Sequence, residues 1–194
     1  MSIENLYLVR HARSALHGKY CGSIDAPLNA YGKRQANGLR RVFSKKRIDI
    51  CFVSDLKRTT QTLDAILKNR DCFILKSPNI REIRFGEWEG KNYKTVSRLY
   101  KNDYNLWMKK PYLIQFPGGE SFSEFYKRVE QFYKFLVEIK SKNVLIVAHG
   151  GTIAALKLIL LDLPKSQFWS LAPRNAEIFH LKKTRGKKWF QWVN

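Results

Sequence analysis

Two histidines in this sequence each follow directly after a short apolar run. Residues 3–9 lead into Arg10 and His11, and residues 144–148 lead into His149. An imidazole can act as a nucleophile or carry a proton, and a guanidinium offers paired N–H donors to phosphate oxygens. Phosphoryl transfer depends chiefly on positioning and on charge stabilisation, so these residue types would suit that chemistry. Taken singly, each histidine is better explained as an ordinary hydrogen-bonded residue at the end of a strand.

The two apolar runs belong to a longer alternation of predicted strands and helices. We expect Asn29 to cap the first helix, and Ser54 or Asp55 to cap the second. This alternation favours an α/β fold, a three-layer sandwich in which helices cover both faces of a mostly parallel sheet. The ligand crevice of such a sheet lies beyond the carboxyl ends of its strands, where both histidines would meet. The approximate strands are 3–9, 48–53, 72–75 and 144–148, the approximate helices are 29–43, 54–67, 122–139 and 152–161, and a hairpin of 176–181 and 188–193 closes the chain.

Length and charge narrow the class of protein. The 194 residues suit a single domain, 1–194, with a helical insertion at about 90–140 that could serve as a lid. The 36 Lys and Arg against 16 Asp and Glu give a net charge of +20, which would attract small anions. The basic residues are scattered and accompany no nucleic-acid-binding motif, so we expect no specific nucleic-acid partner. The sequence has neither an apolar run long enough to span a membrane nor an N-terminal signal pattern, which favours a cytoplasmic protein without a membrane partner.

The cysteines argue against both a disulfide framework and a metal site. Cys21, Cys51 and Cys72 are odd in number and show no CxxC spacing. We therefore expect reduced and mostly buried thiols. No cluster of Asp or Cys with ligand spacing accompanies the histidines, so we expect no metal ion.

Five segments in order along the chain resemble the motifs of the histidine phosphatase (phosphoglycerate mutase-like) superfamily. Leu-Val-Arg-His-Ala-Arg-Ser at 8–14 resembles the first motif, and Arg58 lies in a segment, 54–62, that resembles the second. The remaining three are 81–90, which contains Glu82, Pro-Gly-Gly-Glu-Ser at 117–121, and Val-Ala-His-Gly-Gly at 147–151. A single RHA triplet would be weak evidence, but five ordered segments that cover nearly the whole chain are strong evidence.

The resemblance implies a role for each polar residue in these motifs. His11 would be the nucleophile and form a phosphohistidine, while Arg10, Arg58 and His149 would bind the phosphoryl oxygens. Glu82 would protonate the leaving group and then activate water. This scheme requires no metal ion or cofactor. The expected substrate-binding residues are Arg10, His11, Ser14, His17, Cys21, Gly22, Ser23, Arg58, Glu82, His149 and Gly150.

Residues close to His11 in space or in sequence should affect its protonation and the backbone around it. Two guanidiniums beside His11 should lower its pKa by like-charge repulsion and keep the imidazole neutral at pH 7. Ala12 stands where the family usually has glycine, which would strain the backbone only if that position needed a positive φ. His17 stands where many members have an asparagine, and it would either contact the phosphate or lie outside the pocket.

The substrate is less narrowly indicated than the reaction. The segment 18–28 resembles a stretch of the α-ribazole phosphatase branch, which implies α-ribazole 5′-phosphate in cobalamin biosynthesis. Phosphoserine or a broad range of small phosphate monoesters is the alternative, and phosphoglycerate mutase activity is less favoured because mutases are usually longer. A binding module that uses the basic surface is the competing class, and a homodimer is one option for assembly. Six aromatic residues could stack on a leaving group or simply pack the insertion: Tyr93, Tyr100, Tyr104, Trp107, Tyr112 and Phe116.

Overall fold

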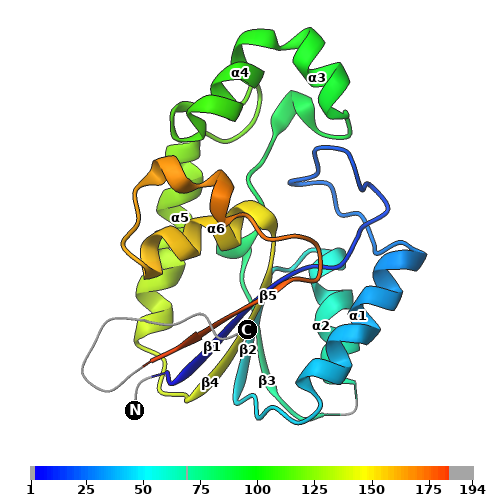
Figure 1. Ribbon diagram of the computed structural model, residues 1–194, viewed down its shortest axis with the longest axis vertical. Helices are drawn as coiled ribbons and strands as arrows, with labels where there is room; N and C mark the ends of the chain where they lie inside the picture. The colour runs from blue at the N-terminus through cyan, green and yellow to red at the C-terminus, as the bar shows by residue number, and fades with distance from the viewer. Residues whose placement is uncertain (1–2, 69, 184–194) are drawn as a thin grey trace.

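A five-stranded sheet forms the centre of the molecule (Figure 1). The computed structural model describes residues 3–68 and 70–183. The strands are β1 (Asn5–Arg10), β2 (Ile50–Val53), β3 (Phe73–Lys76), β4 (Asn143–Ala148) and β5 (Ile178–Lys182). Their order is β3–β2–β4–β1–β5, and only β5 runs antiparallel to its neighbour. The expected mostly parallel sheet is confirmed.

Helices cover both faces of the sheet, as the strand–helix alternation predicts. The α-helices are α1 (Ala30–Phe43), α2 (Lys57–Leu67), α3 (Tyr93–Leu99), α4 (Lys101–Lys109), α5 (Phe122–Val137) and α6 (Gly150–Leu160). Short 3₁₀ helices span Pro78–Ile80, Gly86–Trp88, Pro111–Leu113, Lys165–Gln167 and Trp169–Leu171. Helices α1 and α2 cover one face and α5 and α6 the other, while α3 and α4 lie apart at the top of the view in Figure 1.

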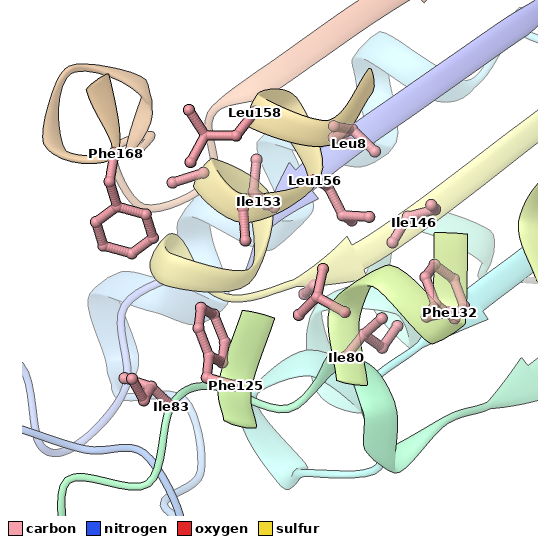
Figure 2. Close-up of a cluster of buried hydrophobic side chains, with 14 of the residues drawn as sticks. Leu8, Ile80, Ile83, Phe125, Phe132, Ile146, Ile153, Leu156, Leu158 and Phe168 are labelled. Carbon is pink, nitrogen blue, oxygen red and sulfur yellow. The ribbon is translucent and has the colours of Figure 1, made fainter. Parts of the chain in front are cut away.

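Alternation along β1 explains why both faces are covered. Leu6 and Leu8 lie in the core under α5 and α6, whereas Tyr7 and Val9 lie in the core under α1 and α2. Successive side chains of a strand point to opposite faces, so an entirely apolar strand needs a helical layer on each side. Figure 2 shows Leu8 among side chains contributed by α5 and α6.

The two helices that follow the first two strands begin in different ways. The Asn29 side chain accepts a hydrogen bond from the Gly32 N–H, so the expected cap of α1 is confirmed. The expected cap of α2 is wrong, because α2 begins at Lys57 without a cap from Ser54 or Asp55. Asp25 Oδ1 accepts the Lys57 N–H instead, at 2.6 Å. The cap therefore comes from a loop 32 residues earlier in the chain.

The segment 90–140 divides into two parts. Helices α3 and α4 lie away from the sheet, whereas α5 packs on the sheet, where Phe132 meets Phe52 of β2 edge to face. The first strand of the expected closing hairpin is β5, and its second strand, 188–193, lies outside the described residues. Within the described part of the chain, no helix has the length and apolar character needed to cross a membrane.

The three cysteines are thiols. Cys51 is buried, Cys21 and Cys72 are half-buried, and none forms a disulfide. The Cys51 and Cys72 sulfur atoms lie 3.1 Å apart. Burial raises the pKa of both thiols, which disfavours the reactive thiolate form.

Candidate active site

The register of β1 with β4 places the two histidines next to each other. Arg10 pairs with Ala148 at the ends of these parallel strands, and the His11 N–H donates to the Ala148 carbonyl at 2.9 Å. His11 directly follows β1 and His149 directly follows β4, and their ring centroids lie 5.1 Å apart. Both side chains are buried. The strand ends therefore meet as the sequence predicts.

Hydrogen bonding determines which nitrogen of His11 carries its proton. Nδ1 lies 2.7 Å from the Ala12 carbonyl, which can only accept, so Nδ1 is the donor and Nε2 keeps a lone pair. The Ala12 N–H donates to Thr62 Oγ1 of α2 at 3.0 Å and anchors the same turn. Ala12 has no positive φ, so its methyl group replaces the expected glycine without backbone strain.

Burial and two positive charges hold the His11 ring neutral. Burial lowers its pKa well below the ordinary value, and the Arg58 and Arg10 guanidiniums lower it further. Like-charge repulsion acts in the expected direction, but burial is the larger cause. The lone pair on Nε2 is therefore available at pH 7.

Arg58 is fully buried and is held mainly by the protein itself. Its Nε donates to His149 Nδ1 at 3.2 Å. Nη1 donates to the Ile24 carbonyl at 2.7 Å, and Nη2 donates to the carbonyls of Cys21 and Gly22 at 3.1 and 2.8 Å. A guanidinium has five N–H groups, so these bonds leave one on Nη1 for a ligand.

His149 lies against Arg58 and does not line the cavity described below. Because a guanidinium only donates, His149 Nδ1 accepts from Arg58, and the neutral ring carries its proton on Nε2. This N–H donates to Ser54 Oγ at 2.9 Å. Burial lowers the pKa of His149 well below its ordinary value, and Arg58 contributes. In this arrangement the ring orients Arg58.

Arg10 presents its guanidinium to the start of α6. Nη1 donates to the Pro173 carbonyl at 2.7 Å, whereas Nε is buried without an acceptor. A Cβ at Gly150 would lie 3.0 Å from Arg10 Cζ, so glycine permits this close approach. The first N–H groups of a helix have no acceptor within the helix, and they lie here beside Arg10. A buried orphan donor at such a place suits an anionic ligand.

Backbone N–H groups orient both oxygens of the Glu82 carboxyl group. Oε1 accepts from the Ile83 N–H at 3.1 Å, and Oε2 accepts from the Gly151 N–H at 3.0 Å. Arg128 donates to the Glu82 carbonyl at 2.9 Å and forms a two-pronged pair with Glu120. Glu120 belongs to the fourth sequence motif. This motif therefore helps to position Glu82, because Glu120 holds Arg128 and Arg128 binds the Glu82 carbonyl.

These groups meet in a cavity of about 210 Å³. Eight of the expected substrate-binding residues line it: Arg10, His11, Ser14, His17, Cys21, Arg58, Glu82 and Gly150. The remaining three, Gly22, Ser23 and His149, do not. His17 lies at the exposed edge, where partial burial and then Arg13 and Arg10 lower its pKa.

Aromatic side chains form the other end of the cavity. Only Trp107 of the six aromatic residues singled out in the sequence lines it. Tyr100, Tyr104 and Phe116 surround the buried Trp88 ring instead, so these three pack the insertion. The other rings of this aromatic end are Tyr20, Phe85, Phe168 and Trp169.

Several residues that shape the site were not expected from the sequence. Ser54 and Thr62 lie in the second motif, so the motif could have indicated them, although only Arg58 was singled out. Asn175 Nδ2 donates to the His11 carbonyl at 3.0 Å, and nothing in its sequence context indicates this contact. No group of three His, Cys, Asp or Glu side chains that could hold a metal ion occurs in residues 3–68 and 70–183.

Comparisons with known proteins agree with this geometry. The model of the histidine phosphatase superfamily (branch 1) matches residues 6–194. Phosphoserine phosphatase 1 of Hydrogenobacter thermophilus is 34% identical over 93% of this chain and 88% of its own length. The adenosylcobalamin/α-ribazole phosphatase of Escherichia coli is 29% identical over 84% and 82%. The crystal structure of the α-ribazole phosphatase from Shigella flexneri superposes with a TM-score of 0.87 at 26% identity, covering 98% of this chain and 96% of that one.

Proposed function

The chain belongs to branch 1 of the histidine phosphatase superfamily, and we propose that it hydrolyses small phosphate monoesters through a phosphohistidine on His11, without a metal ion. One observation carries the proposal. His11, whose Nε2 keeps its lone pair, lines the same cavity as Arg10 and Arg58, and Arg10 has a buried Nε donor without an acceptor. A dianionic phosphoryl group would satisfy that donor and both positive charges.

The first half of the reaction uses the tautomer that the Ala12 carbonyl fixes. His11 Nε2 attacks phosphorus, and the bond from phosphorus to the ester oxygen breaks. Arg10, the remaining N–H of Arg58 and the start of α6 stabilise the charge that spreads over the equatorial oxygens. Glu82 gives its proton to the departing alkoxide.

The second half returns the enzyme to its starting state. The Glu82 carboxylate takes a proton from water as the water oxygen attacks phosphorus, and the bond from phosphorus to Nε2 breaks. Inorganic phosphate leaves, His11 is neutral again, and Glu82 holds the proton needed for the next turnover. His149 acts in this scheme by holding Arg58, since both of its ring nitrogens are bonded within the protein.

For the substrate we favour α-ribazole 5′-phosphate. The aromatic end of the cavity supports this choice, because Trp169, which is exposed and lines the cavity, can pack against the flat base of a nucleoside-like leaving group. The resemblance of segment 18–28 and the similarity to α-ribazole phosphatases support it as well.

Phosphoserine is the second candidate. A cavity of about 210 Å³ is small for a ligand site and suits a compact ester. Relatives that are phosphoserine phosphatases include one 34% identical to this chain.

Two measurements test the proposal. The purified protein should hydrolyse p-nitrophenyl phosphate in the presence of EDTA. Quenching with alkaline denaturant during turnover should trap a phosphoenzyme that is stable in alkali and loses its phosphate in acid. A comparison of kcat/KM for α-ribazole 5′-phosphate, phosphoserine and 3-phosphoglycerate then ranks the substrates. Failure to trap phosphoenzyme during steady turnover would contradict the phosphohistidine, and equal kcat/KM values would contradict a dedicated substrate.

A further inference from the structure

Glu89 lies outside the cavity, yet its contacts lead directly to Arg58. We propose that Glu89 positions the two Nη groups of Arg58, whose Nε is held by His149, and that Glu89 acts through the backbone of residues 21–24. This inference rests on the proposed function, in which Arg58 binds the phosphoryl group. Glu89 lies in the third sequence motif, 81–90, in which the resemblance assigns a role to Glu82 alone.

The Glu89 carboxylate accepts several hydrogen bonds from the loop of residues 21–24. Oε1 accepts the Ser23 N–H at 2.8 Å and the Ser23 hydroxyl at 3.1 Å. Both oxygens lie within 3.1 Å of the Gly22 nitrogen, and Oε1 also accepts the Phe85 N–H at 3.1 Å. Hydrogen bonds to an ionised acceptor are stronger than neutral ones, so this carboxylate fixes the loop more firmly than a neutral side chain would.

The carbonyls of the same loop bind the guanidinium. Cys21, Gly22 and Ile24 supply three of the four acceptors that Arg58 uses within the protein. The loop therefore presents its N–H groups to a carboxylate and its C=O groups to a guanidinium. The peptide dipoles between the two charges point in the favourable direction, and each charge helps to hold the loop for the other.

The loop also packs closely against the segment that carries Glu89. A Cβ at Gly22 would lie 1.9 Å from the Ile83 carbonyl oxygen and 2.8 Å from Glu89 Oε1. The segment that contacts Gly22 thus runs from Glu82, the proposed proton donor, to Glu89. One stretch of chain thereby sets the positions of the proton donor and of the phosphate-binding Arg58 relative to each other.

Loss of the Glu89 carboxylate should misdirect the single N–H that Arg58 has left for substrate. In Glu89→Gln, one of the two oxygens that face the Gly22 N–H becomes an N–H₂ group, which cannot accept a hydrogen bond. The remaining oxygen is neutral and holds the loop N–H groups less firmly, so the loop is free to shift. A displacement of about 1 Å at a catalytic group can cost on the order of 10²-fold in rate. We expect kcat/KM for p-nitrophenyl phosphate to fall by about 10- to 100-fold, with weaker inhibition by orthovanadate to a similar degree.

The experiment compares Glu89→Gln with Glu87→Gln, each alone and combined with Arg58→Ala, and includes Glu89→Asp. Glu87 is exposed two residues away and contacts Tyr100, so its variant makes the same charge change outside the loop. Glu87→Gln should keep wild-type kinetics, and Glu89→Asp should recover part of the loss. In the Arg58→Ala background, Glu89→Gln should add little further loss, because its effect passes through Arg58. Thermal unfolding of every variant separates this effect from a loss of folded protein.

Two results overturn the inference while leaving the proposed function intact. One is wild-type kinetics and vanadate inhibition in Glu89→Gln when Arg58→Ala is impaired. The other is a full additional loss from Glu89→Gln in the Arg58→Ala background, which would mean that Glu89 acts independently of Arg58. If wild-type protein shows no hydrolysis and no vanadate binding, the proposed function itself fails.

Discussion

The two ends of the cavity are built by different means. At the phosphate end, His11, Arg58 and Glu82 are held by directional hydrogen bonds to backbone groups and to other buried polar side chains. At the aromatic end, rings contact rings, as where Trp107 meets Trp169 edge to face at 4.5 Å between centroids. Hydrogen bonds fix the geometry of reacting atoms, whereas ring contacts define mainly shape.

This difference indicates that the residues that carry out the reaction and the residues that select the substrate can change independently of each other. The phosphate end is built from the ends of strands and the starts of the helices that follow them. Every substrate would contact this end. At the aromatic end, Trp107 comes from α4, and Phe168 and Trp169 come from the segment after α6; these parts can change without moving the strand ends. Substitutions at the first end should therefore affect all substrates, and those at the second should affect substrates unequally.

The largest effect is expected for His11→Ala. Removal of the proposed nucleophile should lower kcat by on the order of 10⁴-fold or more for every ester, because no other described side chain in the cavity is placed for the same step. Turnover assays with three unrelated esters, and trapping of the phosphoenzyme with an alkaline quench, measure this loss. Unequal residual activities among the three esters would show that the phosphate end also selects substrates.

The effect of Glu82→Gln should depend on how much the leaving group of the ester needs a proton. General acid–base catalysis contributes about 10²- to 10⁴-fold, and an alkoxide needs the proton more than p-nitrophenolate does. We expect hydrolysis of phosphoserine to fall by that amount. With p-nitrophenyl phosphate we expect a burst of nitrophenolate followed by slow turnover, since Gln cannot activate water. Stopped-flow absorbance detects the burst, and equal losses with both esters and no burst would place Glu82 outside the proton transfer.

Trp169→Leu probes the aromatic end. Stacking of a base on an aromatic ring contributes about 1–3 kcal/mol, so kcat/KM for α-ribazole 5′-phosphate should fall by about 10-fold or more. The loss with phosphoserine should be smaller, because that leaving group has no ring. Tyr93→Leu is the matched control, since Tyr93 is exposed and lies outside the cavity. Parallel losses for both substrates would show that the two ends are not separable.

The smallest effect concerns protonation. The pKa of His11 is lowered well below its ordinary value, whereas His17, at the exposed edge, is shifted by weaker burial. Lowering pH from 7 to about 5.5 would leave only about a tenth of an ordinary histidine neutral, given its pKa of about 6.5. We expect the His11 ring to remain neutral over this range and His17 to protonate first.

Titration of the imidazole signals by NMR measures this order, with His17→Asn to assign one signal. The lowered pKa values of the buried histidines also make the stability of the fold depend on pH. The unfolded chain takes up protons at the positions of His11 and His149 below about pH 6.5 and the folded chain does not, so the free energy of unfolding falls as pH falls. Protonation of His11 before His17, or a Tm that rises toward pH 5, would contradict the proposed electrostatics.

Much of the phosphate end could be predicted because it depends on patterns along the chain. The apolar runs before His11 and His149 marked buried strands, and parallel register then required the two histidines to meet. Asn29 marked the start of α1 because an N-cap is a local contact. The reaction roles, the lid and the homodimer stay predictions.

The rest depends on contacts that leave no local mark in the sequence. The carbonyls that hold Arg58 belong to backbone groups that every residue possesses. Trp169 reaches the cavity only because the segment after α6 folds back over it. The start of α2 was placed too early because Asp25 caps it from another part of the chain, and no local rule contains that contact.

The Asp25 cap has a consequence for local unfolding. Because one carboxylate closes the start of α2 and belongs to the loop that reaches Arg58, the loop cannot lift away without exposing the first amides of that helix. Loop and helix should therefore open together as one cooperative unit, and amide hydrogen exchange would give the same opening free energy for both.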